Sequence, residues 1–552
     1  MKINHATKKL FQGTTVLGMD INSIFVNISR YFYTLKYLRF KQIFYRIFYL
    51  AKNKYKTEHL KLMPRKCENI LFINSIDILY VSYSDKNAFF LLNQIHQFHD
   101  RIDWNYMGSG LSWAYSLNCF EYLHHQTMNK EMGLRLIHDY IDQYRRIRIG
   151  YISYTISLRN FFWIRFLVKN EIRDEKINAF LYDTYMILSR NLEYHLLGNH
   201  LLENAFSLFL GAYYFRDFVF YRKAYKLLKL ELKEQILKDG GHFEKSPVYH
   251  QTILYRLLDC INISLKNKWI EDDLLVFFWT TASAMLSWLK NITFPSGSIP
   301  FFSDSYQNSA PSTADLLCYA ERLGITYKGS LLSDSKYRVF KGDSYTLICD
   351  IDGISPSYQC GHAHADTFNF VLEVNTAPFF VDTGCSTYQA GETRIFERGT
   401  FAHNTVVVNG TNSSDVWSSH RVGKRARVQI LIDTPDKIVA QHNGYKGILH
   451  IRTFQKKTMS IEIIDEIKGE THHIKHNTQH TALFHLDYCI APEDIVVQNN
   501  ELVVSGIINC KFEGSSNLYL VNYEQAIGIN KRANAKCVCV DFDEKLKTII
   551  CF

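Results

Sequence analysis

The chain lacks the features that would place it among membrane-spanning or exported proteins. Its longest aromatic stretch, residues 24–50, is too charged to predict a transmembrane helix. Five cations interrupt it: Arg30, Lys36, Arg39, Lys41 and Arg46. The chain's start has no clean apolar run ending in small residues, so we expect no cleaved signal peptide and a location in the cytoplasm or at the periphery of the envelope. We expect residues 24–50 to pack on the body of the protein, with contact to a membrane surface as the alternative.

Charge and cysteine usage exclude two further classes. The formal net charge of +9, from 63 Lys and Arg against 54 Asp and Glu, is spread over 552 residues and does not predict nucleic-acid binding. A mildly positive cleft would instead attract an acidic ligand. The 12 cysteines form no CxxC pair and only Cys537 and Cys539 lie close together, so we interpret them as reduced core thiols. No pattern indicates an oligomeric state.

What the chain does contain is typical of a globular protein with more than one domain. Its length predicts two or three domains. Hydrophobic residues make up 47% and charged residues 21%, which argues against disorder. The aromatic content of 14% is high and fits either sugar rings stacked on Tyr and Trp or plain core filling.

The first part of the chain has helical periodicity, with apolar residues three and four positions apart. We predict helices at Asn87–Phe98, Met132–Tyr144, Ala179–Leu197, His200–Phe215, Phe220–Leu237, Tyr249–Leu265 and Asp273–Leu289. The letters contain no strict internal repeat. Many helices joined by short loops favour helical hairpins packed in a ring or solenoid.

The period changes after Lys328 to short runs rich in Val, Ile, Phe and Tyr between turn residues. Strands are predicted at Tyr345–Asp350, Phe368–Val374, Thr405–Val408, Arg427–Ile432, Lys437–Gln441, Met459–Ile464, Ala482–Leu486, Glu501–Val504, Leu518–Val521 and Cys537–Asp541. This pattern predicts an antiparallel β-sandwich. We therefore predict a helical extension at 1–85, a helical domain at 86–330 and a β-domain at 331–552, with the boundary near Gly329-Ser330.

The sequence Gly-His-Ala-His-Ala-Asp at 361–366 is the most chemically suggestive stretch. It lies between two predicted strands, and residues two apart on a strand share a face, so His362 and His364 would project together. A bare pair of this kind is also common as surface histidines in a loop. Asp382 and His403 each stand at the edge of an apolar strand further on and would complete a His/Asp/His set suited to zinc.

Two stretches of the helical part place candidate functional residues in the first turn of a predicted helix. Asn199 and His200 open an apolar helix, where Asn199 is either an N-cap or a polar group facing an anion. Ser246-Pro247 is an N-cap and first-position pattern, which places Tyr249 in the first turn. Lowering the pKa of that phenol from 10 to near 7 would take about 4 kcal/mol, more than a helix dipole supplies, so a nearby cation would be needed.

These motifs, in this order, resemble the heparinase II/III-like polysaccharide lyases and, more distantly, alginate lyases of related fold. The motifs are Asn-His-Leu-Leu-Glu-Asn at 199–204, Gly-Gly-His-Phe-Glu-Lys-Ser-Pro-Val-Tyr-His at 240–250, Gly-His-Ala-His-Ala-Asp at 361–366, Val-Asp-Thr-Gly at 381–384 and Ala-His-Asn-Thr at 402–405. The likeness runs from about Asp103 to about Trp417. It implies an (α/α) toroid followed by an antiparallel β-sandwich, with the active cleft between them.

The resemblance also implies a reaction, β-elimination at a uronic acid of an acidic polysaccharide. Asn199 and His200 would neutralise the uronate carboxylate, Tyr249 would act as base, acid or both, and His362 would be its partner. In relatives that carry zinc, the matching ligands are His364, Asp382 and His403, and the metal is structural. Glu203 and Glu244, together with Arg394 and Arg398, are our expected substrate contacts. The alternative for the two arginines is that they lie at a solvated strand end.

The chain departs from the family's motifs at two places, and other functions are compatible with the same residues. Gly198 stands where many relatives have a second Asn, and Asp382-Thr383-Gly384 replaces the commoner Asp-Pro-Gly. A uronyl C5-epimerase would remove the same proton and return it to the other face, and a non-catalytic glycan-binding protein could keep the fold. A glycoside hydrolase would need two facing carboxylates, for which Glu203, Glu244 and Asp304 are weakly supported candidates. The uronate, its sulfation and endo or exo action are not indicated.

Overall fold

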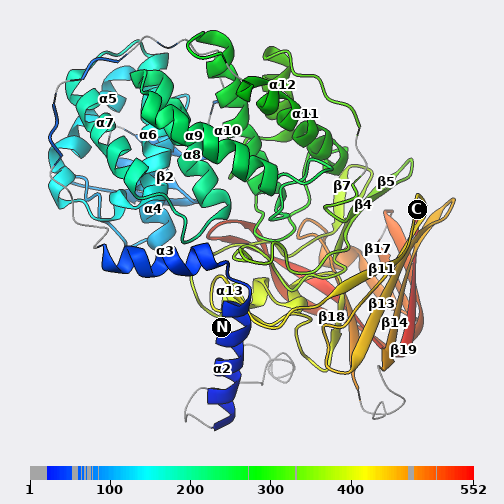
Figure 1. Cartoon of the computed structure of the whole chain (residues 1–552). Coiled ribbons are helices and arrows are strands. Elements are labelled where there is room, and N and C mark those ends of the chain that lie inside the picture. Colours follow the sequence, from blue (N-terminus) through cyan, green and yellow to red (C-terminus); the bar gives the residue numbers. More distant parts are fainter. Residues whose placement is uncertain are drawn as a thin grey trace.

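A computed structural model gives the fold. It describes residues 21–52, 60–63, 65–67, 70, 76–77, 79–84, 86–271, 273–329, 332–469, 478–504 and 506–552. The start of the chain at 1–20 and Ser330 of the expected boundary lie outside the described residues. A helical region comes first and an antiparallel β-rich region follows (Figure 1). This confirms the predicted order of the two kinds of structure.

The helical region contains a series of α-helices, several of which begin at polar caps. They are α2 (Ile21–Lys36), α3 (Phe40–Ala51), α4 (Leu111–Cys119), α5 (Lys130–Gln143), α6 (Ser153–Lys169), α7 (Glu175–Arg190), α8 (Gly198–Phe215), α9 (Phe218–Gln235), α10 (Pro247–Lys266), α11 (Leu274–Ile292) and α12 (Thr313–Arg322). The side chains of Asn129, Asp174, Asp217 and Ser246 accept backbone N–H groups at the starts of α5, α7, α9 and α10. One large apolar core holds helices α4 to α12 together.

The helix predicted at Asn87–Phe98 is wrong. The segment forms strands β2 (Ala88–Leu91) and β3 (Gln94–Gln97), which pair with each other and with β1 (Ser82–Ser84). Leu92 and Asn93 have φ angles of 51° and 60°, the left-handed conformation of a two-residue hairpin turn. The apolar run Ala88–Leu92 fits both the helical and the strand periodicity. It forms a strand because the turn at Leu92 and Asn93 pairs it with β3. The helix predicted at Ala179–Leu197 ends earlier, at Arg190.

The β-rich region has a four-stranded and a ten-stranded antiparallel sheet. The first is β4 (Tyr337–Lys341), β5 (Tyr345–Asp350), β6 (Phe370–Val374) and β7 (Ala377–Phe380), in that order. The second contains β8 (Val406–Val408), β11 (Val428–Thr434), β12 (Lys437–His442), β13 (Ile448–Lys456), β14 (Ser460–Gly469), β15 (His480–His485), β16 (Ile495–Gln498), β17 (Glu501–Val504), β18 (Ile508–Gly528) and β19 (Lys531–Cys551). A short pair, β9 (Val416–Trp417) and β10 (Arg421–Val422), stands apart.

The two large sheets share one apolar core. Leu347 and Phe370 of the smaller sheet belong to the same buried cluster as Phe454 and Val538 of the larger one. Between β7 and β8 the chain forms the short helix α13 (Glu392–Glu397). None of the described helices is long and apolar enough to cross a membrane.

Candidate active site

A cavity of about 500 Å³ lies where the helical and β-rich regions meet. Residues from both regions line it. Those of the helical region include Tyr154, Glu193, Asn199, His200, Glu203, Tyr249, Arg256 and Tyr306, and those of the β-rich region are His362, Tyr388, His420 and Ile529. The four residues expected to be catalytic, Asn199, His200, Tyr249 and His362, therefore line one cavity although they come from three separate segments.

Tyr249 lies in the first turn of α10, as the Ser-Pro pattern predicted. Ser246 Oγ accepts the N–H of Tyr249 at 3.3 Å, and Pro247 occupies the first turn. The Tyr249 hydroxyl lies 3.2 Å from that of Tyr388, and its ring centroid lies 4.1 Å from that of His362. Burial, together with the negative charge of Asp304, holds the pKa of Tyr249 well above its usual range. The lowering that the sequence analysis made conditional on a nearby cation is therefore absent, and the raised pKa favours the protonated phenol.

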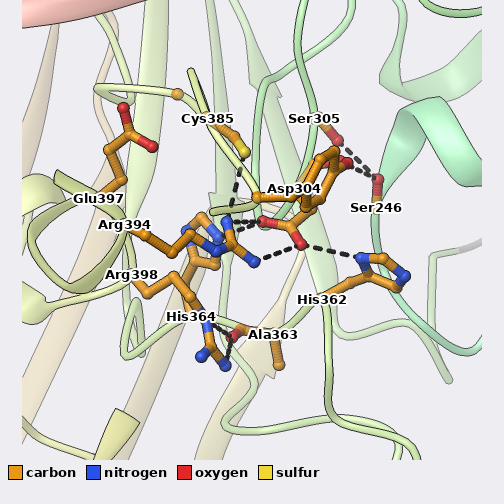
Figure 2. Close-up of polar contacts among 12 residues, drawn as sticks. Ser246, Asp304, Ser305, His362, Ala363, His364, Cys385, Arg394, Glu397 and Arg398 are labelled. Carbon is orange, nitrogen blue, oxygen red and sulfur yellow. Dashed lines mark hydrogen bonds and ion pairs between the residues drawn. The ribbon is translucent and has the colours of Figure 1, made fainter. Parts of the chain in front are cut away.

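Asp304, in a loop of the helical region, connects that region to His362 and other residues of the β-rich region (Figure 2). His362 Nδ1 donates to Asp304 Oδ2 at 2.8 Å, and His364 Nε2 donates to Oδ1 at 2.8 Å. Arg394 donates to both oxygens, at 2.5 and 2.7 Å. Burial alone would raise the pKa of Asp304, but Arg394 and the two histidines hold it well below its usual range. The ionised carboxylate therefore fixes which nitrogen of each histidine carries the proton.

The histidine pair lies in a loop rather than on a strand. Strand β5 ends at Asp350 and β6 begins at Phe370, so residues 361–366 belong to the connection between them. His362 and His364 still serve one centre, because both reach the carboxylate of Asp304. We predicted that the two side chains project together because alternate residues of a strand share a face, but these residues are not on a strand. The observed cause is a common hydrogen-bond acceptor.

Asn199 and His200 lie at the start of α8, but Asn199 is not its N-cap. The cap residue is Leu197, without a side-chain hydrogen bond, and Asn199 falls inside the first turn. Asn199 Oδ1 is buried without a hydrogen-bond partner, beside the cavity. His200 Nδ1 lies 3.5 Å from Glu193 Oε1. Burial would lower the pKa of His200, but Glu193 raises it overall, which favours a cationic imidazole next to the unpartnered amide.

Gly198 takes a conformation that few side chains tolerate. Its φ is +57°, and an added Cβ would lie 2.9 Å from Gln359 Cγ and 3.0 Å from Glu244 Oε1. The Asn that many relatives have at this place would therefore require a shift of Gln359 here. Glycine lets the chain enter α8 close to Glu244.

Glu203 and Glu244 lie on different sides of the cavity wall. Glu203 lines the cavity and its carboxylate lies 3.3 Å from Arg256 Nε. Glu244 is 1% exposed, is absent from the lining and accepts the N–H of Asn199 at 3.3 Å. Its predicted role as a substrate contact is corrected: Glu244 braces the start of α8 from behind. Burial raises the pKa of both carboxyls.

Arg394 and Arg398 do not reach the cavity. Both are 0% exposed. Arg394 is paired with Asp304, and Arg398 Nη2 donates to the carbonyl of Ala363 at 2.9 Å. The prediction that they contact the substrate is therefore corrected. The two guanidinium groups hold Asp304 and the histidine loop in place, because short loops without ladder hydrogen bonds need side-chain donors for their buried carbonyls.

The residues predicted to bind zinc lie close together behind the cavity. The rings of His364 and His403 are 5.4 Å apart, and His403 Nδ1 donates to Asp382 Oδ2 at 2.9 Å. Asp304 and Asp382 hold one nitrogen of each imidazole, which leaves His364 Nδ1 and His403 Nε2 buried and without partners.

Carboxylates that hold one ring nitrogen while the other faces a metal are typical of zinc histidines. The donor chemistry thus fits zinc, with His364 and His403 as ligands and Asp382 as a third ligand or as the group that orients His403. Among the described residues no set of three His, Cys, Asp or Glu is already arranged as a metal site.

Sequence reasoning missed several residues of this site. Asp304 was considered only as a weak hydrolase carboxylate, and Tyr388, Tyr306, Glu193 and Arg256 were not singled out. They lie in loops or within apolar helices, where single polar residues carry no pattern. The one local signal was Ser-Asp-Ser at 303–305, directly after an apolar run.

Comparison with known proteins identifies the family. Family models described as "Heparinase II/III N-terminus" and "Heparinase II/III-like, C-terminal" match residues 141–321 and 325–527. The chain belongs to the heparinase II/III family. Among curated proteins, a heparin-sulfate lyase of Bacteroides stercoris is 26% identical over 309 residues, 50% of this chain and 44% of that protein. A heparin-sulfate lyase of Pedobacter heparinus is 24% identical over 243 residues, 39% of this chain and 36% of that protein.

Solved structures share the fold. A heparinase III structure aligns with a TM-score of 0.66 at 16% identity and covers 92% of this chain and 91% of its own. A heparan sulfate lyase mutant from Pedobacter heparinus aligns with a TM-score of 0.56 at 15% identity, covering 99% and 92%. The sequence alignments span less than half of either curated relative. The family models establish the family, and the solved structures establish the fold.

Proposed function

We propose that this chain is a polysaccharide lyase that cleaves a uronic-acid-containing glycan by β-elimination. The observation that carries the proposal is the convergence of Asn199, His200, Tyr249 and His362 on one cavity. The names of the heparin-sulfate lyase relatives support a glycosaminoglycan as the substrate class. We also propose the (α/α) toroid and β-sandwich architecture, supported by the helical hairpins and by the core that both sheets share.

Asn199 and His200 would hold the uronate carboxylate. Removal of the C5 proton places negative charge on that carboxylate, and donors that meet the charge lower the barrier. His200 supplies a positive charge that Glu193 supports from behind, at 3.5 Å. Asn199 can turn its amide N–H group toward the substrate because its Oδ1 is held by no other group.

His362 and Tyr249 would divide the proton transfers. Asp304 holds the proton of His362 on Nδ1, so Nε2 has the lone pair that takes the C5 proton. Tyr249, whose pKa is raised by burial, keeps its proton and delivers it to the O4 leaving oxygen. The C5–H and C4–O4 bonds break, the C4–C5 double bond forms, and the glycan is released as two chains. Zinc at His364 and His403 would hold the loop from behind and takes no part in these transfers.

The partner in this proposal is an acidic polysaccharide or oligosaccharide. The cavity lining contains one guanidinium, Arg256, which is already paired with Glu203, and several tyrosines and amides. A uronate would therefore be recognised mainly by His200 and by hydroxyl contacts. Location in the cytoplasm or at the envelope stays a prediction.

Absorbance of the unsaturated uronate product tests the proposal directly. Purified protein would be incubated with heparan sulfate, hyaluronan, chondroitin, alginate and bacterial surface polysaccharides. We expect a rise on at least one glycan and a fall of about 10²-fold or more in Tyr249→Phe. Tyr225→Phe is the matched control. The Tyr225 hydroxyl donates a hydrogen bond to Asp273, and Tyr225 does not line the cavity.

The alternatives give different results in the same samples. Exchange of the C5 proton for deuterium without any rise in absorbance would identify a C5-epimerase. Binding of a glycan with neither signal would identify a non-catalytic binding protein. Either result would overturn the lyase.

A further inference from the structure

The two N-terminal helices expose a continuous series of large apolar side chains. Ten of the 26 large apolar side chains that are exposed in the described chain lie between residues 28 and 50: Ile28, Tyr31, Phe32, Leu35, Phe40, Ile43, Phe44, Ile47, Phe48 and Leu50. Phe40 is 81% exposed and Leu50 is 85% exposed. Apolar surface gathered in this way usually marks an interaction site. We call these ten residues the apolar face of α2 and α3.

The opposite sides of the same helices are attached to the body of the protein. Helix α2 contacts the β-rich region, where Arg30 pairs with Asp415 at 2.8 Å and Thr34 donates to the carbonyl of Val422 at 3.2 Å. Helix α3 contacts the helical region, where Gln42 donates to the carbonyls of Leu196 and Tyr358. Figure 1 shows α3 along the edge of the helical region and α2 turning away from it beside α13. The body thus holds both helices with their apolar face outward.

The charge of this segment has one sign. Residues 21–57 contain no Asp or Glu, and they contain Arg30, Lys36, Arg39, Lys41, Arg46, Lys52, Lys54 and Lys56. In the whole chain Lys and Arg exceed Asp and Glu by only 63 to 54. Lys36, Lys41, Arg46 and Lys52 are exposed beside the apolar face. Aromatic and aliphatic side chains flanked by cations match the boundary of an anionic membrane, where apolar groups enter the acyl region and cations meet lipid phosphates.

We propose that the apolar face of α2 and α3 docks this protein on an anionic membrane surface. Helix α3, with 12 residues, is about 18 Å long and does not span an acyl region of about 30 Å. It therefore lies in the plane of the surface. A second copy of the chain fits this face less well, because two such faces would bring together cations without any carboxylate to pair them.

The two helices contact residues that line the cavity. Arg46 of α3 donates to the carbonyl of His195, and Gln42 to that of Leu196; both His195 and Leu196 line the cavity. Thr34 of α2 donates to the carbonyl of Val422, near the cavity residue His420. Membrane docking would hold the cavity beside the lipid surface and favour glycan chains attached there. Only this last step rests on the proposed function.

Sedimentation with lipid vesicles tests the docking. The full chain would be mixed with phosphatidylcholine vesicles and with vesicles that also contain phosphatidylglycerol. We expect sedimentation with the anionic vesicles, weakened by salt, and little with the neutral ones. The double variant Phe44→Glu with Ile47→Glu should weaken it at least about tenfold, because both side chains are exposed and their charge would be driven into the apolar layer.

The control is Leu431→Glu with Ile432→Glu, which places the same charges on exposed apolar positions of β11. It should sediment like the parent protein. Absence of sedimentation with anionic vesicles, or equal loss in the control, would overturn the proposal. A dimer in solution that the Phe44 and Ile47 variant dissociates would assign the face to a second copy instead. Lyase activity on short soluble oligosaccharides should be unchanged in this variant, so failure of docking and failure of the lyase proposal are distinguishable.

Discussion

His362 donates from Nδ1 to Oδ2 of Asp304 at 2.8 Å, and neither oxygen of this carboxylate is exposed to solvent. The bond joins a histidine of the β-rich region to a loop of the helical region. It decides that the lone pair of His362 lies on Nε2. The same carboxylate also accepts His364 and Arg394, so the positions of His362, His364 and Arg394 all depend on one acidic side chain.

Replacing Asp304 with Asn should therefore lower kcat strongly. An amide has one acceptor oxygen for donors that now share two, so His362 loses its fixed proton position. We expect kcat to fall about 10²-fold or more, with a smaller change in KM. The measurement is steady-state product absorbance per folded molecule, with the folded fraction taken from circular dichroism.

The matched control for Asp304→Asn is Asp465→Asn. Asp465 is also fully buried and also accepts one arginine and one histidine, Arg452 and His450, but it lies in the β-rich core outside the cavity. Both variants should lose stability, about 3 kcal/mol or more, because a buried arginine is left without its partner. Only Asp304→Asn should lose turnover. Equal losses of kcat would contradict the role assigned to Asp304.

The alkaline limb of the activity profile should depend on Glu193. Glu193 raises the pKa of His200 although burial opposes it, and Glu244 and Glu203 add smaller effects of the same sign. Because the protonated imidazole would meet the uronate carboxylate, kcat/KM should fall as the pH rises through the pKa of His200.

Glu193→Gln removes the nearest negative charge and should move this fall to lower pH. The check is kcat/KM measured across the pH range for both proteins, with Tyr225→Phe as a variant that leaves the profile unchanged. An alkaline limb at the same pH in Glu193→Gln would show that another group sets it.

Zinc should be bound by the purified protein and should stabilise it. Elemental analysis is expected to find about one zinc per chain, and a chelator should lower the melting temperature, because ligands that bind only the folded state stabilise it. His364→Ala and His403→Ala should lose the metal. His99→Ala, at an exposed position, should keep it. Stoichiometry near zero in the parent protein after growth with zinc would contradict the prediction.

Acid should destabilise the β-rich core through Asp465. Burial would raise the pKa of this carboxyl, but Arg452 and His450 lower it from 3.8 to about 2. A lowered pKa stabilises the folded state above the unfolded value, and this contribution is lost as the pH falls from about 4 to about 2. It amounts to about 2 kcal/mol.

Denaturant unfolding at a series of acid pH values checks this contribution. The difference in free energy of unfolding between the parent and Asp465→Asn should shrink by about 2 kcal/mol over that range. Glu462→Gln, a partly exposed carboxylate of the same strand paired with Lys547, should change stability by about 0.5 kcal/mol or less. A difference that stays constant with pH would contradict the assignment.

Much of this protein follows from local pattern. Apolar periods of about 3.6 and 2 located many of the long helices and most strands, since packing of an amphipathic face is what stabilises such elements. Helix α6 was not predicted, because it is buried on nearly all sides and has no polar face. Ser246 and Pro247 located the start of α10 because capping is decided within one turn. The hairpin at Ala88–Gln97 was missed because a run of apolar residues fits both periods, and only its pairing partner distinguishes them.

The sequence by itself determined the order of the two regions and the family. It also predicts Asn199, His200, Tyr249 and His362 as site residues, because each lies in a motif with its own spacing. Only the tertiary structure decided what surrounds them. Asp304 meets His362 from 58 positions away, and Arg394 meets Asp304 from 90 positions away. Burial raises the pKa of Tyr249. Burial also keeps the side chains of Arg394 and Arg398 out of the cavity. Burial and long-range charge pairs depend on how distant segments pack, and no local pattern records that.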